Sequence, residues 1–391
     1  MNIYLLYCIV GNEKGPLEHI SATVKYLSRF GHSLTILISM DQDLKNLGQY
    51  GKCILLPTSK YSRSIWNTLF KLVTYQIYAF WILFINYRNI DVIYLRQSVF
   101  LISPVIFSLF KRKSLITEVN GFLDKDLKER KRLKIFRKIN RLCEKFTYSC
   151  SKFIVCVSNS LKNEILKNFN IIDQNKVVVI YNGSEKYSNK FRRSKNEIKQ
   201  KLGLNLKRFY LVYVGMLSER ENVSDIIYKM KEIVSIYPNI NLLIIGDGSL
   251  KNKLIKIASK NHLLSFIEFK GYLPHKKMIE YISACDIGIF NKKTRDDYLG
   301  FQLKIVDYLA AGIPVVGPIS EDYLFIQKNK LGILYDYDHE KGFMNAVIKI
   351  LNDRKKVYMN EFNCKRYFEN NLTWKGQIKK VDNLILESKN C

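Results

Sequence analysis

Two apolar runs that each end in glycine constrain the fold of this chain most. They are Leu-Val-Tyr-Val-Gly at 211–215 and Leu-Leu-Ile-Ile-Gly at 242–246. Apolar runs between polar, helix-forming stretches predict parallel strands that are buried on both faces and alternate with helices. A glycine at the carboxyl end of such a strand lets the backbone turn sharply and approach a ligand closely. The sequence therefore predicts an α/β fold with a binding site at the strand ends.

The position of these glycines, each directly after a predicted strand, indicates which kind of ligand can bind at the strand ends. In open α/β sheets, ligands bind at the carboxyl ends of the strands, where helix N-termini direct free N–H groups at phosphates. A third segment, Asp-Tyr-Leu-Ala-Ala-Gly-Ile-Pro-Val-Val at 307–316, follows in the same half of the chain. A single glycine after a strand is more often ordinary turn chemistry, but several in register favour a nucleotide diphosphate.

Length and the change of composition along the chain predict two domains. A chain of 391 residues with 47% hydrophobic content can bury two cores of ordinary size. Alternating strands and helices occupy residues 1–183, give way to a polar, basic segment at 184–208, and resume at 209–370. We expect a doubly wound parallel sheet in each half and a basic linker between them. Strands are expected at 3–10, 33–38, 91–95, 115–119, 153–157 and 177–180, and from 209 through 246, 267–271, 287–290 and 314–316.

The cysteines and histidines give no sign of a metal site. The eight cysteines are scattered and none forms a Cys-x-x-Cys pair, and the histidines and Asp286 have no spacing that argues for a metal. We expect no metal, no bound cofactor, and free thiols in a reducing compartment. The first ten residues favour a strand over a signal peptide, which indicates a cytoplasmic protein.

The formal net charge of +28 indicates an anionic partner. Phosphate-bearing substrates, an anionic membrane and nucleic acid would each fit, but we find no zinc finger, RNP-type motif or basic zipper, which disfavours nucleic acid. Residues 125–141 are basic around an apolar stripe of Leu133, Phe136, Ile139 and Leu142 at helical spacing. Such a helix either lies on anionic headgroups or packs its stripe on its own domain. Both readings stay open.

An apolar segment at 72–85 could be mistaken for a membrane span. It is shorter than the ~20 apolar residues that a spanning helix needs, and Lys71 and Arg88 flank it. We expect a buried helix or an interfacial element, and at most a peripheral attachment to a membrane.

Landmarks along the chain resemble the GT-B-fold retaining glycosyltransferases, the class often called glycosyltransferase family 4 or group 1. In order they are Gly15 to His19 with Gly31-His32, Glu118 to Gly121, Val157-Ser158, Tyr181 to Gly183, Gly246 to Gly248, Phe269 to Tyr272, Ala284 to Asp286, and Thr373-Trp374. The resemblance implies two Rossmann-like domains that face each other across a cleft. It also implies that 371–391 is a C-terminal helix that crosses back to the first domain.

The reaction implied by the resemblance displaces a nucleoside diphosphate from the anomeric carbon of a sugar by an acceptor hydroxyl. Catalysis would then rest on stabilising the diphosphate and on holding the acceptor in line. The family usually has an arginine and a lysine where this chain has Met216 and Glu221. Arg220, one residue away, could supply a phosphate contact or be a solvent-facing arginine. Lys304 is the second cationic candidate, because 300–308 resembles a branch of the family with a lysine three positions before the acidic residue.

The acidic pair of the family is only half present. Asp307 matches the second acid, which binds the ribose hydroxyls, although a carboxylate here could also stabilise a helix N-terminus. Leu299 occupies the first position and cannot accept a hydrogen bond, so Asp296 or Asp297 is the candidate substitute.

The resemblance also assigns the remaining contacts to the donor. Asn120 stands where many relatives have a histidine that contacts the sugar, and Tyr272 where the nucleobase lies. Backbone N–H groups that face the sugar and diphosphate are expected at Gly15, Gly300, Phe301 and Gln302.

The expected function is transfer of a sugar from a nucleotide sugar to a glycolipid or lipid-linked saccharide in cell-surface polysaccharide synthesis. The enzyme would be cytoplasmic and peripheral on the inner face of an anionic membrane, and would not bind nucleic acid. The alternatives are a catalytically silent GT-B scaffold or binding subunit, and a sugar-nucleotide epimerase on the same fold.

Overall fold

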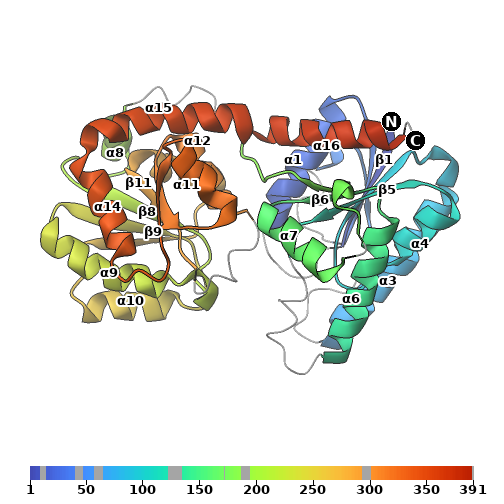
Figure 1. Cartoon of the computed structure of the whole chain (residues 1–391), viewed down its shortest axis with the longest axis horizontal. Coiled ribbons are helices and arrows are strands. Elements are labelled where there is room, and N and C mark those ends of the chain that lie inside the picture. The colour runs from blue at the N-terminus through green and yellow to red at the C-terminus, as the bar shows by residue number, and fades with distance from the viewer. Residues whose placement is uncertain are drawn as a thin grey trace. The chain divides into compact units, whose positions relative to one another are not determined.

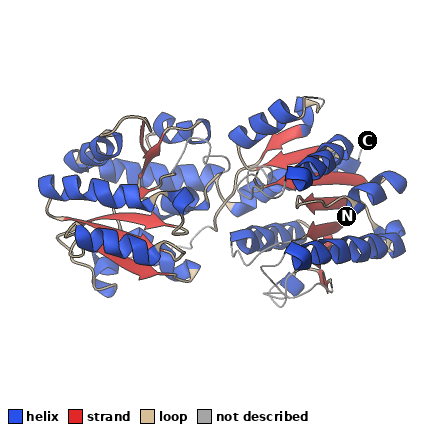
Figure 2. Cartoon of the chain, turned by 90° about the horizontal axis from the view of Figure 1, so that it is seen from below, coloured by secondary structure: helices blue, strands red, loops and turns tan. Residues whose placement is uncertain are grey.

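The computed structural model divides the chain into two compact units (Figure 1). It describes residues 1–8, 15–39, 47–56, 65–121, 134–170, 172–185, 194–292 and 301–389. The first unit comprises Met1–Asn182 and Trp374–Cys391, and the second comprises Gly183–Thr373. Each unit has one sheet with helices packed against it (Figure 2).

The first unit contains a seven-stranded parallel sheet in the order β3-β2-β1-β4-β5-β6-β7. Its central strands are buried along almost their whole length, as continuous apolar runs predict. The strands are β1 (Asn2–Tyr7), β2 (Ser33–Ile38), β3 (Lys52–Leu55), β4 (Val92–Arg96), β5 (Ser114–Val119), β6 (Phe153–Cys156) and β7 (Val177–Val179). The helices named below are α1 (Gly15–Arg29), α3 (Ile65–Ile85), α4 (Ser103–Phe110), α6 (Lys134–Cys150), α7 (Asn159–Asn168) and α16 (Trp374–Lys389).

The second unit contains a six-stranded parallel sheet in the order β10-β9-β8-β11-β12-β13. Its strands are β8 (Phe209–Val214), β9 (Ile240–Ile245), β10 (Ile267–Gly271), β11 (Ile287–Ile289), β12 (Val315–Pro318) and β13 (Gly332–Tyr335). Its helices are α8 (Lys195–Lys201), α9 (Val223–Ile236), α10 (Lys251–Lys260), α11 (His275–Ala284), α12 (Leu303–Ala311), α13 (Leu324–Lys328), α14 (Gly342–Asn352) and α15 (Arg354–Asn371). The expectation of two doubly wound parallel sheets is confirmed.

The chain passes between the two units twice, after Asn182 and before Trp374, and the residues at these two crossings lie next to each other. Ser184 forms a parallel β-bridge with Thr373, and its backbone N–H donates to the carbonyl oxygen of Leu372 at 3.0 Å. Within the segment expected as a linker, residues 194–208 belong to the second unit and include α8, which Ser194 and Glu197 cap reciprocally. In the first unit, α16 packs on α1, and Asp382 pairs with His32 at 2.6 Å.

The two glycines at the ends of β8 and β9 are required by close approach of the chain to itself. Gly215 and Gly246 have φ of +147° and +145°. A Cβ atom on Gly246 would lie 1.9 Å from the carbonyl oxygen of Gly215, and one on Gly215 would lie 2.8 Å from Nζ of Lys304. Only glycine lets these two loops and Lys304 meet.

The segment expected as a buried or interfacial helix is the second half of α3. Leu72, Tyr75, Ala79 and Leu83 pack into the core of the first unit. No helix in the described ranges is long and apolar enough to cross a membrane. The seven cysteines in those ranges are free thiols.

Candidate active site

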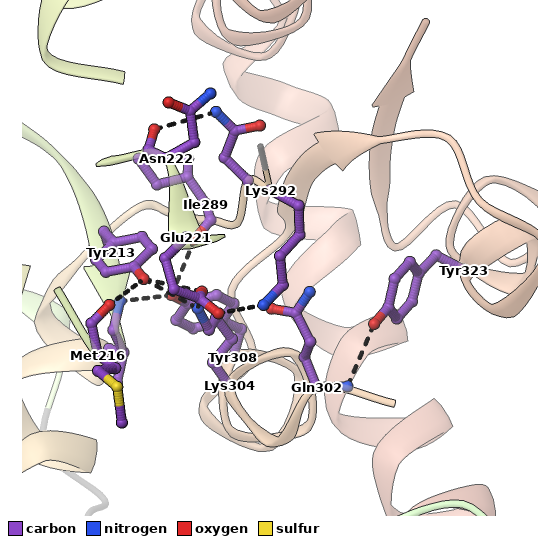
Figure 3. A network of polar contacts seen from close by, with 12 residues as sticks. Tyr213, Met216, Glu221, Asn222, Ile289, Lys292, Gln302, Lys304, Tyr308 and Tyr323 are labelled. Carbon is purple, nitrogen blue, oxygen red and sulfur yellow. Dashed lines mark hydrogen bonds and ion pairs between the residues drawn. The ribbon is translucent and has the colours of Figure 1, made fainter. Parts of the chain in front are cut away.

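A cluster of buried charges lies at the carboxyl ends of β8 and β11 (Figure 3). Glu221, in the short 3-10 turn that follows β8, pairs with Lys292, which follows β11, and with Lys304 in the first turn of α12. Nζ of Lys304 lies 2.6 Å from Oε2 of Glu221. The hydroxyl of Tyr213 donates to the same oxygen at 3.0 Å and accepts from Lys304 at 3.2 Å.

Helix α12 is fixed to the sheet by a buried tyrosine. The hydroxyl of Tyr308 accepts the backbone N–H of Val214 at 2.9 Å and donates to the carbonyl oxygen of Ile289 at 3.1 Å. These bonds join α12 to β8 and β11, so the helix that bears Lys304 has a defined position at the strand ends.

The side chains of Lys292, Lys304 and Glu221 are only 8%, 10% and 13% exposed. Burial alone would raise the pKa of Glu221, but Lys304 and Lys292 outweigh it and lower that pKa to about 2. Burial lowers the pKa of Lys292 to about 8, with Lys304 and Arg220 adding repulsion while Glu221 opposes the shift. The cluster contains two cationic groups and one anion, so its charge is positive when Lys292 is protonated.

This cluster explains how the chain can have Glu221 at a position where the family usually has a lysine. A carboxylate beside a diphosphate would ordinarily repel it, but Glu221 is enclosed by two lysines, and the three groups together leave positive charge at the strand ends. Arg220 is exposed on the same turn and is near enough to affect the pKa of Lys292. Met216 is also exposed and contributes its carbonyl oxygen near the hydroxyl of Tyr213, at 3.2 Å.

The residues before α12 are held by aromatic side chains. Phe301 is buried, with its ring centroid 5.9 Å from that of Tyr323 and 6.0 Å from that of Phe325. The backbone N–H of Gln302 donates to the hydroxyl of Tyr323 at 3.2 Å, so a diphosphate would have to replace that partner. Both polar atoms of the Gln302 side chain are buried without a hydrogen-bond partner in the described residues. Gly300, Leu299, Asp296 and Asp297 lie outside those residues.

Asp307 lies one turn further along α12 from Lys304. Its Oδ1 accepts a hydrogen bond from Oγ of Ser184 at 2.8 Å and lies 3.3 Å from Nε2 of His275. Because α12 begins at Leu303, Asp307 lies beyond the first turn and cannot act as a helix N-terminal carboxylate. Tyr272, the candidate base contact, is largely exposed just after β10.

A second cluster lies at the carboxyl ends of β4 and β5 in the first unit. Glu118 is buried and accepts hydrogen bonds from Arg96 at 2.8 Å and from Tyr94 at 2.6 Å, and His19 lies 3.2 Å away. Burial would raise the pKa of Glu118, but His19, Arg96 and Tyr94 hold it well below its ordinary value. The side-chain amide of Asn120 also donates to Glu118, so this carboxylate orients Asn120.

The structure thus places Arg220 on the turn whose next residue, Glu221, pairs with Lys304 in the second unit, and leaves Asn120 and Gly15 in the first. Gly15 is the first residue of α1. Lys292 and Glu118 were not expected to contribute. Lys292 could have been found, because it follows a predicted strand at the end where ligands bind. Among the residues that the structure describes, no group of three or more His, Cys, Asp or Glu side chains could hold a metal ion.

Two family models match the chain, one in each half. The model described as Glycosyltransferase Family 4 matches residues 15–185, and the model described as Glycosyl transferases group 1 matches residues 194–364. Together they include both charge clusters.

Curated relatives are glycosyltransferases too. The chain is 26% identical over 317 residues to an uncharacterised glycosyltransferase of Methanocaldococcus jannaschii, with 78% of each chain covered. It is 28% identical over 221 residues to the capsular polysaccharide biosynthesis glycosyltransferase CapM of Staphylococcus aureus, covering 54% of this chain and 55% of CapM. It is 24% identical over 144 residues to the alpha-monoglucosyldiacylglycerol synthase of Acholeplasma laidlawii, covering 37% and 35%.

Solved structures share the fold over the whole chain. Anabaena HepE, whose crystal structure is in complex with UDP, superposes with a TM-score of 0.76 at 15% identity and covers 99% of this chain and 100% of its own. With the two parallel sheets, the strand-end clusters and the family matches in agreement, the chain belongs to the group 1, family 4 glycosyltransferases of the GT-B fold and is a nucleotide-sugar-dependent enzyme of that class.

Proposed function

We propose that this enzyme transfers a sugar, with retention of configuration, from a nucleoside diphosphate donor to a glycolipid or lipid-linked saccharide in cell-surface polysaccharide synthesis. The observation that carries the proposal is the cationic cluster of Lys292, Lys304 and Glu221 at the carboxyl ends of β8 and β11. This is the place in an open α/β sheet where a ligand binds. Its charge suits a diphosphate, which gains negative charge as it leaves.

Each residue of the cluster then has a distinct role. Lys304 and Lys292 attract the diphosphate, and Arg220 adds a guanidinium at the exposed side. Glu221 is a positioning residue, since it holds both ammonium groups without touching the ligand. The buried amide of Gln302 is a further hydrogen-bonding group next to this cluster (Figure 3).

The sugar and nucleoside contacts complete the proposal. Asp307 and Tyr272 are the candidates for the ribose and the base, and Asn120 for the sugar. In the reaction, the bond from the anomeric carbon to the diphosphate oxygen breaks, the acceptor oxygen bonds to that carbon on the face that the diphosphate leaves, and the acceptor's proton passes to the departing diphosphate. Asn120 cannot carry this proton at neutral pH, so its role is to orient the sugar.

The comparisons support the donor and the acceptor only by likeness. HepE was crystallised with UDP, which makes uracil the first base to test. One relative is named for a diacylglycerol glycolipid and another for capsular polysaccharide, which supports a lipid-linked or polysaccharide acceptor. A cytoplasmic, peripheral location on the inner membrane face would bring the enzyme to such an acceptor.

Calorimetric titration tests the donor site. UDP, GDP, ADP and their hexose conjugates should include at least one ligand that binds, and Lys304→Met should weaken its binding at least tenfold. Lys260→Met, an exposed lysine at the end of α10, is the control and should leave binding unchanged. Well-folded protein that binds none of these ligands would refute the proposal and favour the silent scaffold that Met216 and Leu299 suggest.

Product analysis separates the remaining alternative. With a donor that binds, transfer should require an acceptor. Conversion of the donor sugar into its epimer without any acceptor would instead show an epimerase.

A further inference from the structure

Helix α3 is apolar on both of its faces. The face with Leu72, Tyr75 and Ala79 packs into the core. The opposite face is exposed, with Ile77 and Trp81 64% and 60% accessible. Its other exposed members are Phe70, Val73, Tyr78, Phe84 and Ile85. A surface helix ordinarily presents polar side chains to water, so this stripe needs a partner.

Helix α4 extends the exposed stripe. It packs on α3, with the rings of Phe80 and Phe107 6.0 Å apart in an edge-on arrangement. Its exposed side chains are Ile106, Leu109 and Phe110. Nζ of Lys111 lies 5.1 Å from the ring centroid of Phe84 and 4.6 Å from that of Phe110, so one cation joins the exposed ends of both helices.

Helix α6 lies next to α4 on the same side of the sheet (Figure 1). Its core-facing residues are polar or amphipathic, whereas Ile139, Leu142 and Phe146 are exposed. Lys138, Arg141 and Lys145 are exposed beside them. Ile139 and Leu142 belong to the apolar stripe of the basic segment described from the sequence. Because both are exposed, these two residues do not pack on their own domain. Residues 125–133 of that segment lie outside the described residues.

The positive charge of these helices indicates which kind of partner the exposed face binds. Helices α3 and α4 contain no Asp or Glu, and the one acidic residue of α6, Glu144, is buried. A two-fold contact between copies would set this cationic surface against itself, which is unfavourable. Anionic lipid headgroups complement the cations, and the rings of Trp81 and Tyr78 suit the boundary between headgroups and hydrocarbon.

We propose that the exposed face of α3, α4 and α6 binds the surface of an anionic bilayer. Helix α3 lies in the plane of the interface, because its other face is committed to the core. This inference rests on the proposed function, for which it names the surface that brings the enzyme to a lipid-linked acceptor.

Vesicle co-sedimentation of the full chain tests the face. The protein should sediment with phosphatidylcholine vesicles that contain phosphatidylglycerol, and should bind pure phosphatidylcholine at least tenfold more weakly at low salt. Trp81→Ser with Phe110→Ser should weaken binding at least tenfold. Ile236→Ser with Leu264→Ser, at similarly exposed positions of the second unit, should not change it. Replacing Lys138, Arg141 and Lys145 by glutamine should remove most of the salt dependence.

Two results would overturn this assignment. One is vesicle binding that the Trp81→Ser and Phe110→Ser changes leave intact. The other is a protein that ignores vesicles but forms dimers that these changes dissociate, as seen by sedimentation velocity. Titration of the same variants with nucleoside diphosphate should give wild-type affinity. If the wild type binds nucleoside diphosphate but not vesicles, only the membrane-binding surface is refuted. If the wild type binds no nucleoside diphosphate, the proposed function is refuted.

Discussion

Glu221→Gln removes the only carboxylate that the structure shows between Lys292 and Lys304, and its cost can be estimated in two ways. At an effective dielectric constant of ~20, charges 2.6 Å apart attract by about 6 kcal/mol, and desolvation offsets part of this. The shift of the Glu221 pKa from 4.5 to about 2 corresponds to about 3 kcal/mol. We expect the substitution to lower the free energy of unfolding by about 3 kcal/mol at neutral pH.

The sign of the pH dependence follows from the same shift. The pKa of Glu221 is lower in the folded protein than in the unfolded chain, so its stabilisation is complete above pH 4.5 and is lost as the pH falls toward about 2. The difference between wild type and Glu221→Gln should therefore shrink over that interval.

The assay must report on the second unit. All three tryptophans, Trp66, Trp81 and Trp374, lie in the first unit, so their fluorescence follows the wrong transition. Circular dichroism during denaturation, resolved into two transitions, gives the required free energy. Glu219→Gln is the matched control, because this exposed residue lies on the same turn and its carboxylate pairs with Lys253 at the surface. Equal stability of Glu221→Gln and Glu219→Gln at neutral pH would refute the account of the cluster.

Three further substitutions test other parts of the structure. Lys292→Met should abolish a rise in stability between pH 8 and 10.5, where unfolded Lys292 binds more protons than folded Lys292; a pH series of denaturation curves for both proteins checks this. Asp307→Asn should weaken UDP binding about tenfold but leave pyrophosphate binding unchanged, as measured by calorimetry; equal losses for both ligands would contradict a ribose contact. Glu118→Gln should destabilise the first unit by about 3–5 kcal/mol, because Arg96 loses its buried partner. Tryptophan fluorescence follows that transition, and a change below ~1 kcal/mol would contradict the buried pair.

The sequence predicted every strand of the two sheets except one edge strand in each, and the edge strands β7 and β10 were among those predicted. Strands β1, β8 and β9 are continuous apolar runs that a buried parallel strand requires, and they were predicted. Strands β3 and β13 were not predicted. Both have four residues, lie at sheet edges and are only partly buried, so they lack a long apolar run.

The sequence indicates which part of the chain forms the candidate site, but it does not indicate which charged side chains pair with one another. Lys304 could be found from the motif at 300–308, which includes the start of α12. Its partnership with Glu221 could not, because the two residues are 83 positions apart and meet only in the folded chain. Lys292 is likewise 71 positions from Glu221. The substitution at 221 therefore looked unfavourable in the sequence, since its two counter-charges are contributed by other strands and helices.

The contact of Gly246 with Gly215 affects how a mutational scan of this enzyme would be interpreted. Any side chain at 246 must displace the carbonyl group of Gly215, and that loop borders Lys304. Substitutions at 246 would thus abolish turnover without the residue ever touching the donor. An activity map alone would score Gly246 as part of the catalytic apparatus, although it acts as a spacer between two loops.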